Sequence, residues 1–540
     1  MSSTASAQTP DALSSTLLTG RSLVLLQLLS RLLTFGLNQS LIRIASPEVF
    51  GTAAIQFDLV CSTILFLSRE GIRNASLRSK QDVRPKVGNG RRQDEALSII
   101  PLQLGMIVAA LVCSIYLYSS LKATTSQPNF HLSLGSYVLS ALLELAIEPL
   151  YLRALRSTPP RINIRVQAEG GMAIGKAVVT VASLLVLPGK PLLGFALGQL
   201  AGAVWLAGRY LFEFGDIKGL LWVSTPQGYV TVCDHQASSG LAHKFRQNRF
   251  DPGTLSLAIA NTRQSVIKHV LTEADRIAVG RISPLGDQGG YAVAMNYGAY
   301  TLLPLYSADL VSGSLVARIV FQPLEETLLL HFSTSLSAPS TPHLLIFVLH
   351  ISAHLLLLLP AFLPPLLLAI LPILFPRRYI HTSAPSTLET YLKWYIPLLS
   401  LNGILEAFHA SSSTPGQVAR QARWMIGSSA AFALGLFGLI HLPKAVQLGT
   451  EKALIYASCL AMLFRIAYAW QHASRFFAGR TGGLSVSSVA PRLQAIVSTL
   501  VSGCILRILE QTGRWRVSWR GWMELVGAGG VLGLGVLAIM

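Results

Sequence analysis

Arginines and glutamates inside long apolar stretches are the residues of this chain best suited to chemistry. An ionisable side chain at the middle of a bilayer costs at least about 2.5–3.5 kcal/mol, so such groups usually face protein or a water-filled cavity. Both signs of charge occur in apolar segments throughout the chain, which predicts a polar cavity between two helical bundles. Arginine in that cavity would suit a cargo carrying phosphate, because the guanidinium fork binds phosphate through two hydrogen bonds. The candidate cavity residues are Arg43, Arg69, Glu70, Glu144, Glu148, Glu169, Glu273, Arg276, Arg318, Glu325, Glu406 and Arg465.

Any single member of this set could instead snorkel to the membrane surface or bridge two helices. Glu144 and Glu148 are four residues apart and are expected on one face of one helix. The size of the set, rather than any one residue, favours a shared cavity.

No catalytic or cofactor pattern accompanies these charges. Gly170–Ala177 nearly matches a phosphate-binding loop, but Ala177 replaces the Ser or Thr that would hold Mg²⁺ and no buried strand precedes it. Its small residues are predicted to let helices pack closely. His350 and His354 share a helix face without a carboxylate, which indicates packing rather than a metal site. The five cysteines form no CxxC pair or disulfide framework. From these three observations together we expect no catalytic residues, no metal, no cofactor and no ATP hydrolysis by this chain.

The elements that carry these residues are predicted to be membrane-spanning helices. Hydrophobic residues make up 51% and charged residues 13% of the chain, and the mean hydropathy is +0.51, whereas a soluble domain is about 25% charged. Apolar runs such as 99–121 and 132–152 reach the length of about 20 residues that crosses a bilayer. Backbone groups in hydrocarbon must be paired within the segment, and the runs lack the alternation of β-barrel strands. The fold class is therefore an all-α polytopic membrane protein.

Fourteen spans are predicted, near 22–42, 49–68, 97–120, 131–152, 168–188, 191–213, 254–280, 289–321, 344–375, 388–410, 424–443, 450–474, 493–509 and 522–540. Their spacing predicts a tail (1–20), a six-helix bundle (21–214), a linker (215–252), a second six-helix bundle (253–475) and two further helices (476–540). Pro360, Pro364 and Pro365 predict a kink or a re-entrant piece in the long run 344–375.

The net charge of +18 is distributed as in a membrane protein. Basic residues collect in short segments between apolar runs, which excludes a nucleic-acid-binding face. The segment Arg69–Arg92 is predicted to be cytoplasmic because it is rich in basic residues. An even number of predicted spans separates it from the linker and from each terminus, so these are predicted to lie on the same side. Arg514, Arg516 and Arg520 fall on the opposite side by this count, so either a late span is miscounted or this link departs from the positive-inside rule.

Several stretches of the chain resemble the Rft proteins, which are eukaryotic endoplasmic-reticulum proteins linked to translocation of dolichol-linked oligosaccharide. The matching stretches are Leu28–Phe35, Pro47–Gly51, Leu67–Arg73, Ser140–Leu145, Glu148–Tyr151, Val166–Gly170, Lys268–Arg276, Leu315–Glu326 and Asn402–Phe408. The chain departs from the family pattern at Ser458 and Ala461, where the family carries asparagines.

This resemblance implies a flippase-superfamily fold in the endoplasmic-reticulum membrane. It also implies a role in moving a dolichyl-diphosphate oligosaccharide of five mannoses and two N-acetylglucosamines to the lumenal leaflet for N-glycosylation. The expected partners are that lipid, the bilayer and the N-glycosylation machinery. In this hypothesis four arginines neutralise the diphosphate, namely Arg43, Arg69, Arg318 and Arg465. Glu273 and Glu406 would accept hydrogen bonds from sugar hydroxyls or balance the arginines in the empty state.

Three other functions stay open at the level of sequence. The first is a scaffold or lipid-linked-oligosaccharide chaperone of the glycosylation machinery without transport. The second is a glycosyltransferase using dolichyl-phosphate sugars, although the first loop is short and holds only Glu48 as an acid. The third is a drug or cation antiporter of the same superfamily.

Overall fold

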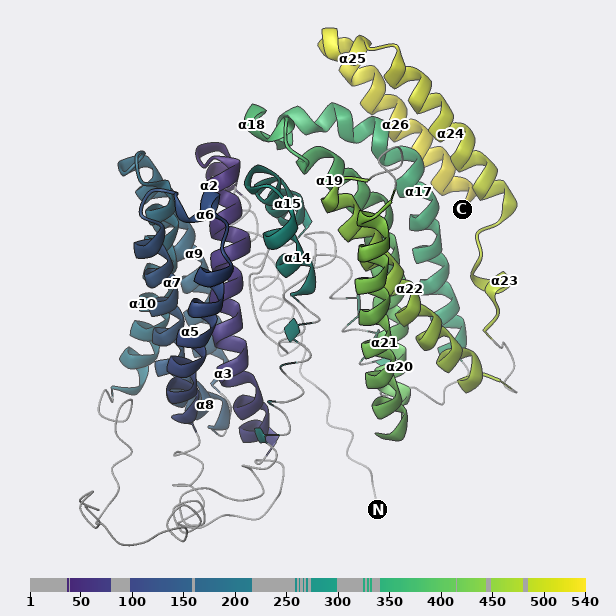
Figure 1. Cartoon of the computed structure of the whole chain (residues 1–540). Helices are drawn as coiled ribbons and strands as arrows, with labels where there is room; N and C mark the ends of the chain where they lie inside the picture. The colour runs from purple at the N-terminus through teal and green to yellow at the C-terminus, as the bar shows by residue number, and fades with distance from the viewer. Residues whose placement is uncertain are drawn as a thin grey trace, which may run out of the picture.

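The computed structural model describes residues 36–78 except 38, 98–157, 161–215, 273–298, 340–413, 415–442, 448–478 and 484–540, with scattered positions in 258–270 and 324–332. Every regular element within these residues is a helix (Figure 1). The first-half helices are α2 (Pro47–Gly51), η1 (Thr52–Phe57), α3 (Asp58–Arg78), α5 (Ile100–Ser119), α6 (Lys122–Thr125), α7 (Phe130–Ala146), α8 (Glu148–Arg156), α9 (Ile162–Val186) and α10 (Pro191–Phe214).

The second-half helices continue the order. They are α14 (Ala274–Ile282), α15 (Leu285–Gly298), α17 (Thr341–Leu374), α18 (Arg377–Ile380), α19 (Ala384–Thr390), η3 (Tyr391–Tyr395), α20 (Ile396–Ser412), α21 (Pro415–Ile440), α22 (Thr450–Phe476), α23 (Val486–Val489), α24 (Leu493–Gln511), α25 (Arg514–Val517) and α26 (Trp519–Ile539).

Ten helical segments in the described part of the chain are long and apolar enough to cross a membrane. They are Pro47–Arg73, Ile100–Ser119, Phe130–Leu155, Gln167–Val186, Pro191–Phe214, Thr341–Leu374, Arg423–Ile440, Thr450–Phe476, Leu493–Gln511 and Trp519–Ile539. Each coincides with a predicted span, which confirms the all-α polytopic fold. The predicted span 388–410 is helical but carries Lys393 and Glu406 and is not among the ten. The spans near 22–42 and 289–321 lie largely outside the described residues, and the span near 254–280 is described only in part, so the count of fourteen stays a prediction.

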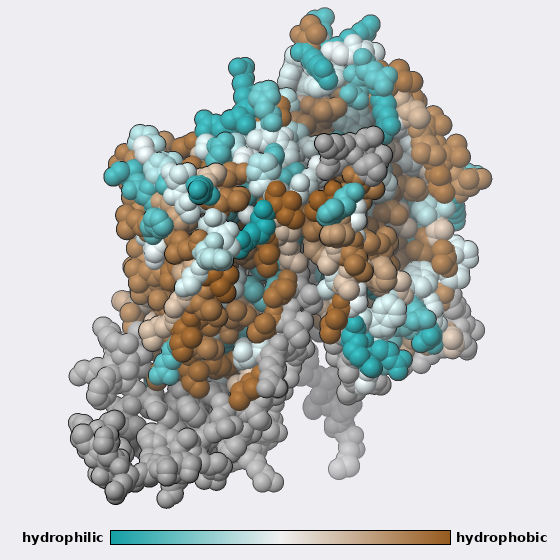
Figure 2. Space-filling model, in the orientation of Figure 1, coloured by the Kyte–Doolittle hydropathy of each residue, from teal (hydrophilic) through white to brown (hydrophobic). Residues whose placement is uncertain are grey.

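Apolar side chains cover the outer flanks of the helices. Ile107 on α5 is 69% exposed, and Leu185, Phe437 and Leu534 are similarly uncovered. In Figure 2, hydrophobic residues cover much of the visible flanks, while hydrophilic residues gather toward the upper and lower ends. A soluble protein rarely exposes apolar surface of this extent, so hydrocarbon is the solvent of these flanks.

The helices form two groups in Figure 1. Helices α3, α5, α7, α9 and α10 lie on one side, and α17 with α20, α21 and α22 lies on the other. The short helices α14 and α15 lie between them, and α24 and α26 pack on the outside of α17. The predicted domain boundaries remain predictions.

Helix α17 is one continuous helix, so the predicted re-entrant alternative is wrong. Proline removes a backbone hydrogen bond and bends a helix, and Figure 1 shows α17 bent, with its C-terminal part crossing the upper end of the molecule. This part reaches the first half, where the Ile373 carbonyl accepts a hydrogen bond from Arg43 (3.3 Å). The following helix α18 makes two more contacts there: Arg378 donates to the Ile44 carbonyl (3.0 Å), and the Tyr379 hydroxyl donates to the Ala45 carbonyl (3.4 Å).

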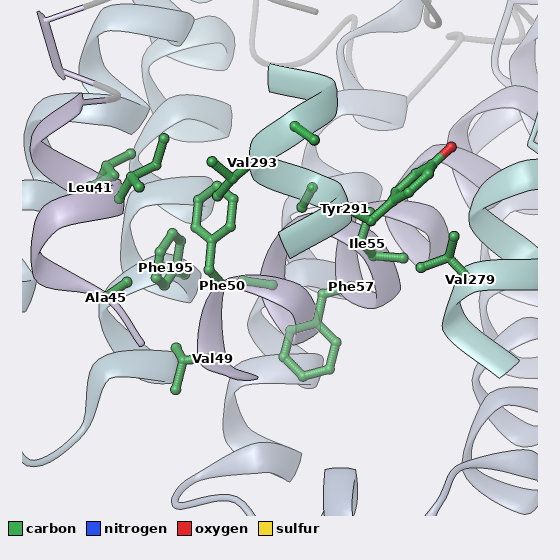
Figure 3. Close-up of a cluster of buried hydrophobic side chains, with 14 of the residues drawn as sticks. Leu41, Ala45, Val49, Phe50, Ile55, Phe57, Phe195, Val279, Tyr291 and Val293 are labelled. Carbon is green, nitrogen blue, oxygen red and sulfur yellow. The ribbon is translucent and has the colours of Figure 1, made fainter. Parts of the chain in front are cut away.

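The two groups meet closely where α2 packs against α15. Figure 3 shows the apolar core of this junction, in which Phe50 of α2 lies near Phe195 of α10 and Val293 of α15. The backbones touch through glycine: a Cβ on Gly51 would lie 2.6 Å from the Gly289 nitrogen, and a Cβ on Gly289 would overlap the Pro47 carbonyl oxygen. Only glycine permits this approach.

We predict that Gly289→Ala lowers the free energy of unfolding by about 1–3 kcal/mol, because the added methyl group must force α2 and α15 apart. Gly286→Ala on the same helix is the matched control, since its Cβ would meet only Glu48 Oε1 at 3.8 Å. Thermal unfolding of the purified protein in detergent measures both. Equal melting temperatures for the two variants would contradict the close contact.

Candidate functional site

The best-formed charged contact joins α3 to α8. Arg73 donates from Nε and Nη2 to the two carboxylate oxygens of Glu148, each at 2.7 Å. The Arg73 guanidinium also lies over the Tyr151 ring, 3.9 Å from its centroid. The chain leaves α7 at Ile147 and restarts α8 with Pro149 in its first turn, which places Glu148 at a helix N-terminus that favours a carboxylate.

A second pair lies one turn earlier and joins α3 to α7. Arg69 Nη1 is 3.4 Å from Glu144 Oε2. Arg69 and Arg73 are four residues apart on α3, as are their partners, so the pairs form a two-step ladder. Glu144 and Glu148 both contact α3, as residues on one helix face do, and only a one-residue turn at Ile147 divides α7 from α8 within the apolar segment Phe130–Leu155.

The ladder continues onto α9. Arg165 donates to Glu169 Oε1 at 3.1 Å, and its guanidinium lies 5.4 Å from the Tyr151 centroid. Glu169 Oε2 is buried and accepts no hydrogen bond from any described residue. Glu70 is buried and interacts electrostatically with Arg73. The basic and acidic groups of α3, α7, α8 and α9 therefore make one cluster.

Asp58 connects this cluster to the second half of the chain. Its carboxylate lies 3.8 Å from Lys176 Nζ on α9 and 3.4 Å from Arg276 Nη1 on α14. Arg276 also pairs with Glu273 at 3.3 Å. Asp58 and Lys176 lie within apolar spans, yet their side chains are 37% and 38% exposed. Charges exposed at this depth need water or another polar group beside them.

The second half has its own pair between α20 and α22. Arg465 Nε and Nη2 donate to Glu406 Oε1 at 2.9 and 2.6 Å, and both side chains are partly exposed. Glu325 interacts electrostatically with Arg465. Tyr395 interacts electrostatically with both Asp275 and Arg465, which links this pair to α14.

The structure brings together ten of the predicted residues in three groups. They are Arg69, Glu70, Glu144, Glu148 and Glu169 around α3, Glu273 and Arg276 on or beside α14, and Glu325, Glu406 and Arg465 around α20. Arg43 lies apart from them, exposed, and donates to the Ile373 carbonyl at 3.3 Å. Arg318 lies outside the described residues.

Four charged residues of these groups were not among the predicted site residues, namely Asp58, Arg73, Arg165 and Lys176. Asp58 had a usable signal, because it is an isolated acid in the middle of the predicted span 49–68. Arg73 follows Arg69 by one helical turn, which was a second signal.

The histidine pair on α17 packs between helices. His350 Nδ1 lies 3.0 Å from the Val489 carbonyl oxygen, and His354 Nδ1 lies 2.7 Å from the His350 carbonyl oxygen. Among the described residues no cluster of three or more His, Cys, Asp or Glu side chains could hold a metal ion.

The family model and the individual relatives that match this chain agree with one another. A family model described as Rft protein matches residues 15–540. The Man(5)GlcNAc(2)-PP-dolichol translocation protein RFT1 of Yarrowia lipolytica is 31% identical over 488 residues, covering 83% of this chain and 68% of the relative. The proteins of the same name from Schizosaccharomyces pombe and Saccharomyces cerevisiae are 28% and 27% identical. The first alignment covers 92% of this chain and 89% of the relative, and the second covers 83% and 81%.

We predict that Arg73→Ala destabilises the protein by about 3–5 kcal/mol, because it leaves the buried Glu148 carboxylate without either of its hydrogen bonds. Arg161→Ala is the matched control. Arg161 is 53% exposed and shares Glu213 with Arg209, so its loss should cost less than about 1 kcal/mol. The double variant Arg73→Met/Glu148→Met should be more stable than Arg73→Ala. Chemical unfolding in detergent measures all three, and a mild effect of Arg73→Ala would contradict the assignment.

Proposed function

Because the chain belongs to the Rft protein family, we propose that it moves dolichyl-diphosphate-linked oligosaccharide of the Man5GlcNAc2 type from the cytoplasmic to the lumenal leaflet of the endoplasmic reticulum. The names of its relatives support this substrate. The chain acts as a transporter for protein N-glycosylation rather than as an enzyme, and it hydrolyses no ATP.

The observation that carries the proposal is the position of Asp58. This carboxylate lies within an apolar span and contacts Lys176 of the first half and Arg276 of the second. Its partial exposure supports a hydrated space between the halves, because hydrocarbon would not solvate it. The sugar headgroup crosses through this space while the polyprenyl tail remains in lipid.

The ion pairs allow the cargo to bind by exchange, in which its diphosphate replaces the glutamate beside each arginine. In the empty state Glu144, Glu273 and Glu406 neutralise the arginines beside them. A diphosphate offers the guanidinium groups a bidentate acceptor of equal or higher charge, so it can displace a carboxylate. Each released carboxylate then accepts hydrogen bonds from sugar hydroxyls. Arg69, Arg276 and Arg465 are the proposed diphosphate ligands, and the described structure leaves open the same role for Arg43 and Arg318.

The distribution of basic residues supports one orientation. Basic segments follow α3 and α10 in the sequence, so we propose that the end at which these two helices terminate, the lower end in Figure 1, faces the cytoplasm. The junction of α2 and α15 then lies toward the lumen. Release of the headgroup into the lumen requires this glycine contact to open.

The proposal is tested by translocation of a labelled dolichyl-diphosphate oligosaccharide in vesicles that contain only the purified protein. Arg465→Ala should lower the initial rate at least about tenfold, because it removes one charge-assisted phosphate contact. The swapped variant Arg465→Glu/Glu406→Arg should regain thermal stability, since opposite charges still face each other, but should not regain transport.

The swap separates a carrier from a structural ion pair. Full transport by the swapped variant would mean that Arg465 only holds α20 to α22. Arg161→Ala, which changes an exposed pair, is the control and should transport normally. Binding of the lipid by the wild-type protein without any translocation would instead favour the scaffold function.

A further inference from the structure

A pocket of about 330 Å³ opens between α21 and α22 at the lower end of the pair. Its walls include Gln417, Arg420, Trp424, Tyr468, His472 and Arg475. The apolar span of α21 begins at Arg423 and that of α22 ends at Phe476. The pocket therefore lies where two spans leave the hydrocarbon, at the depth of lipid headgroups.

The two arginines of this pocket differ from those of the charged groups described above. Arg73, Arg276 and Arg465 each pair with a carboxylate. Within the described part of the chain, the guanidinium groups of Arg420 and Arg475 contact no carboxylate, and both side chains are exposed. Two unpaired guanidinium groups from different helices on one small pocket are suited to an anion with several oxygen acceptors.

The wall beside the arginines consists of aromatic rings and glutamine side chains. The rings of Trp424 and Tyr468 lie 5.5 Å apart, tilted by 32°, and Trp424 is exposed. The Tyr468 hydroxyl donates to the Gln417 carbonyl (3.3 Å), which fixes the floor of the pocket. An exposed indole offers an apolar face for a ring, and the side-chain amide of Gln471 offers both a donor and an acceptor for hydroxyls.

We propose that this pocket is a binding site for a lipid headgroup in which phosphate is joined to a polyhydroxylated ring. Arg420 and Arg475 hold the phosphate, Trp424 packs against the ring, and the acyl or prenyl chain enters the bilayer beside α21. The pocket lies beyond the Arg465–Glu406 pair, toward the C-terminal end of α22, and neither residue of that pair lines it. Two of its wall residues also contact α20: His472 is hydrogen-bonded to Ser412 at 2.8 Å, and Tyr468 packs against His409. The site does not depend on transport, because either a phospholipid or a glycosylated polyprenyl diphosphate carries the recognised chemistry.

The experiment measures equilibrium binding to the purified full chain in detergent by microscale thermophoresis. The probes are dioctanoyl phosphatidylinositol, a short-chain polyprenyl-diphosphate N-acetylglucosamine, dioctanoyl phosphatidylcholine and inorganic diphosphate. At least one ring-bearing probe should bind more tightly than phosphatidylcholine and than diphosphate. Arg420→Gln/Arg475→Gln should weaken that binding at least about tenfold, since it removes both charge-assisted contacts.

Arg423→Gln is the matched control, because Arg423 is an exposed arginine on the same helix that does not line the pocket. It should change the affinity by less than about twofold, the residual effect of a screened surface charge. Arg420→Lys/Arg475→Lys keeps the charge without the guanidinium fork and should bind with intermediate affinity. The melting temperature of the double glutamine variant, measured in the same detergent, should match that of the wild type. The ring-bearing probe that binds more tightly identifies the source of the headgroup.

Three results would overturn the site. They are equal weakening by Arg423→Gln, unchanged affinity in the double glutamine variant, and diphosphate or phosphatidylcholine binding as tightly as both ring-bearing probes. The first would indicate diffuse surface charge, the second a different location, and the third recognition without a ring.

Discussion

The cost of placing a charge in hydrocarbon constrains the whole structure. Each ionisable side chain within a span must find an opposite charge, a backbone carbonyl or water. Arg73 and Glu148 satisfy one another completely, with two hydrogen bonds and an aromatic ring beneath the guanidinium. Asp58 and Lys176 are satisfied only in part, because more than a third of each side chain is exposed. Arg73 and Glu148 therefore hold helices together, whereas Asp58 and Lys176 can also bind a ligand.

The same constraint explains how the two halves are joined. Where no charge is needed, α2 and α15 approach through Gly51 and Gly289 until their backbones touch. Deeper in the molecule the halves meet through the Asp58–Arg276 pair instead. A glycine contact at one end and a charged contact within the spans would allow the halves to separate at the first while exchanging partners at the second. That combination fits the proposed movement of a charged headgroup.

The sequence predicted the spans well because an apolar run of about 20 residues has one low-energy structure in lipid. It did not predict partners, because pairing depends on the register between helices that are distant in the chain. Arg69 and Arg73 face Glu144 and Glu148 only once α3 packs on α7 and α8. The break at Ile147 was readable from Pro149, which disfavours helix in the preceding residues. The prolines of α17 were compatible with a kink or a re-entrant piece, and the continuous course of the helix from Thr341 to Leu374 distinguishes them.

The central claim is that Asp58 faces water between the halves rather than lipid. The most direct measurement is electron paramagnetic resonance of a nitroxide at position 58 in the reconstituted protein, comparing relaxation by a polar nickel chelate with relaxation by oxygen. A nitroxide at Ile107, on the exposed apolar flank of α5, is the reference for lipid. The account predicts that the nickel chelate relaxes position 58 more strongly than oxygen does, with the opposite order at position 107. The oxygen-dominated order at both positions would contradict it.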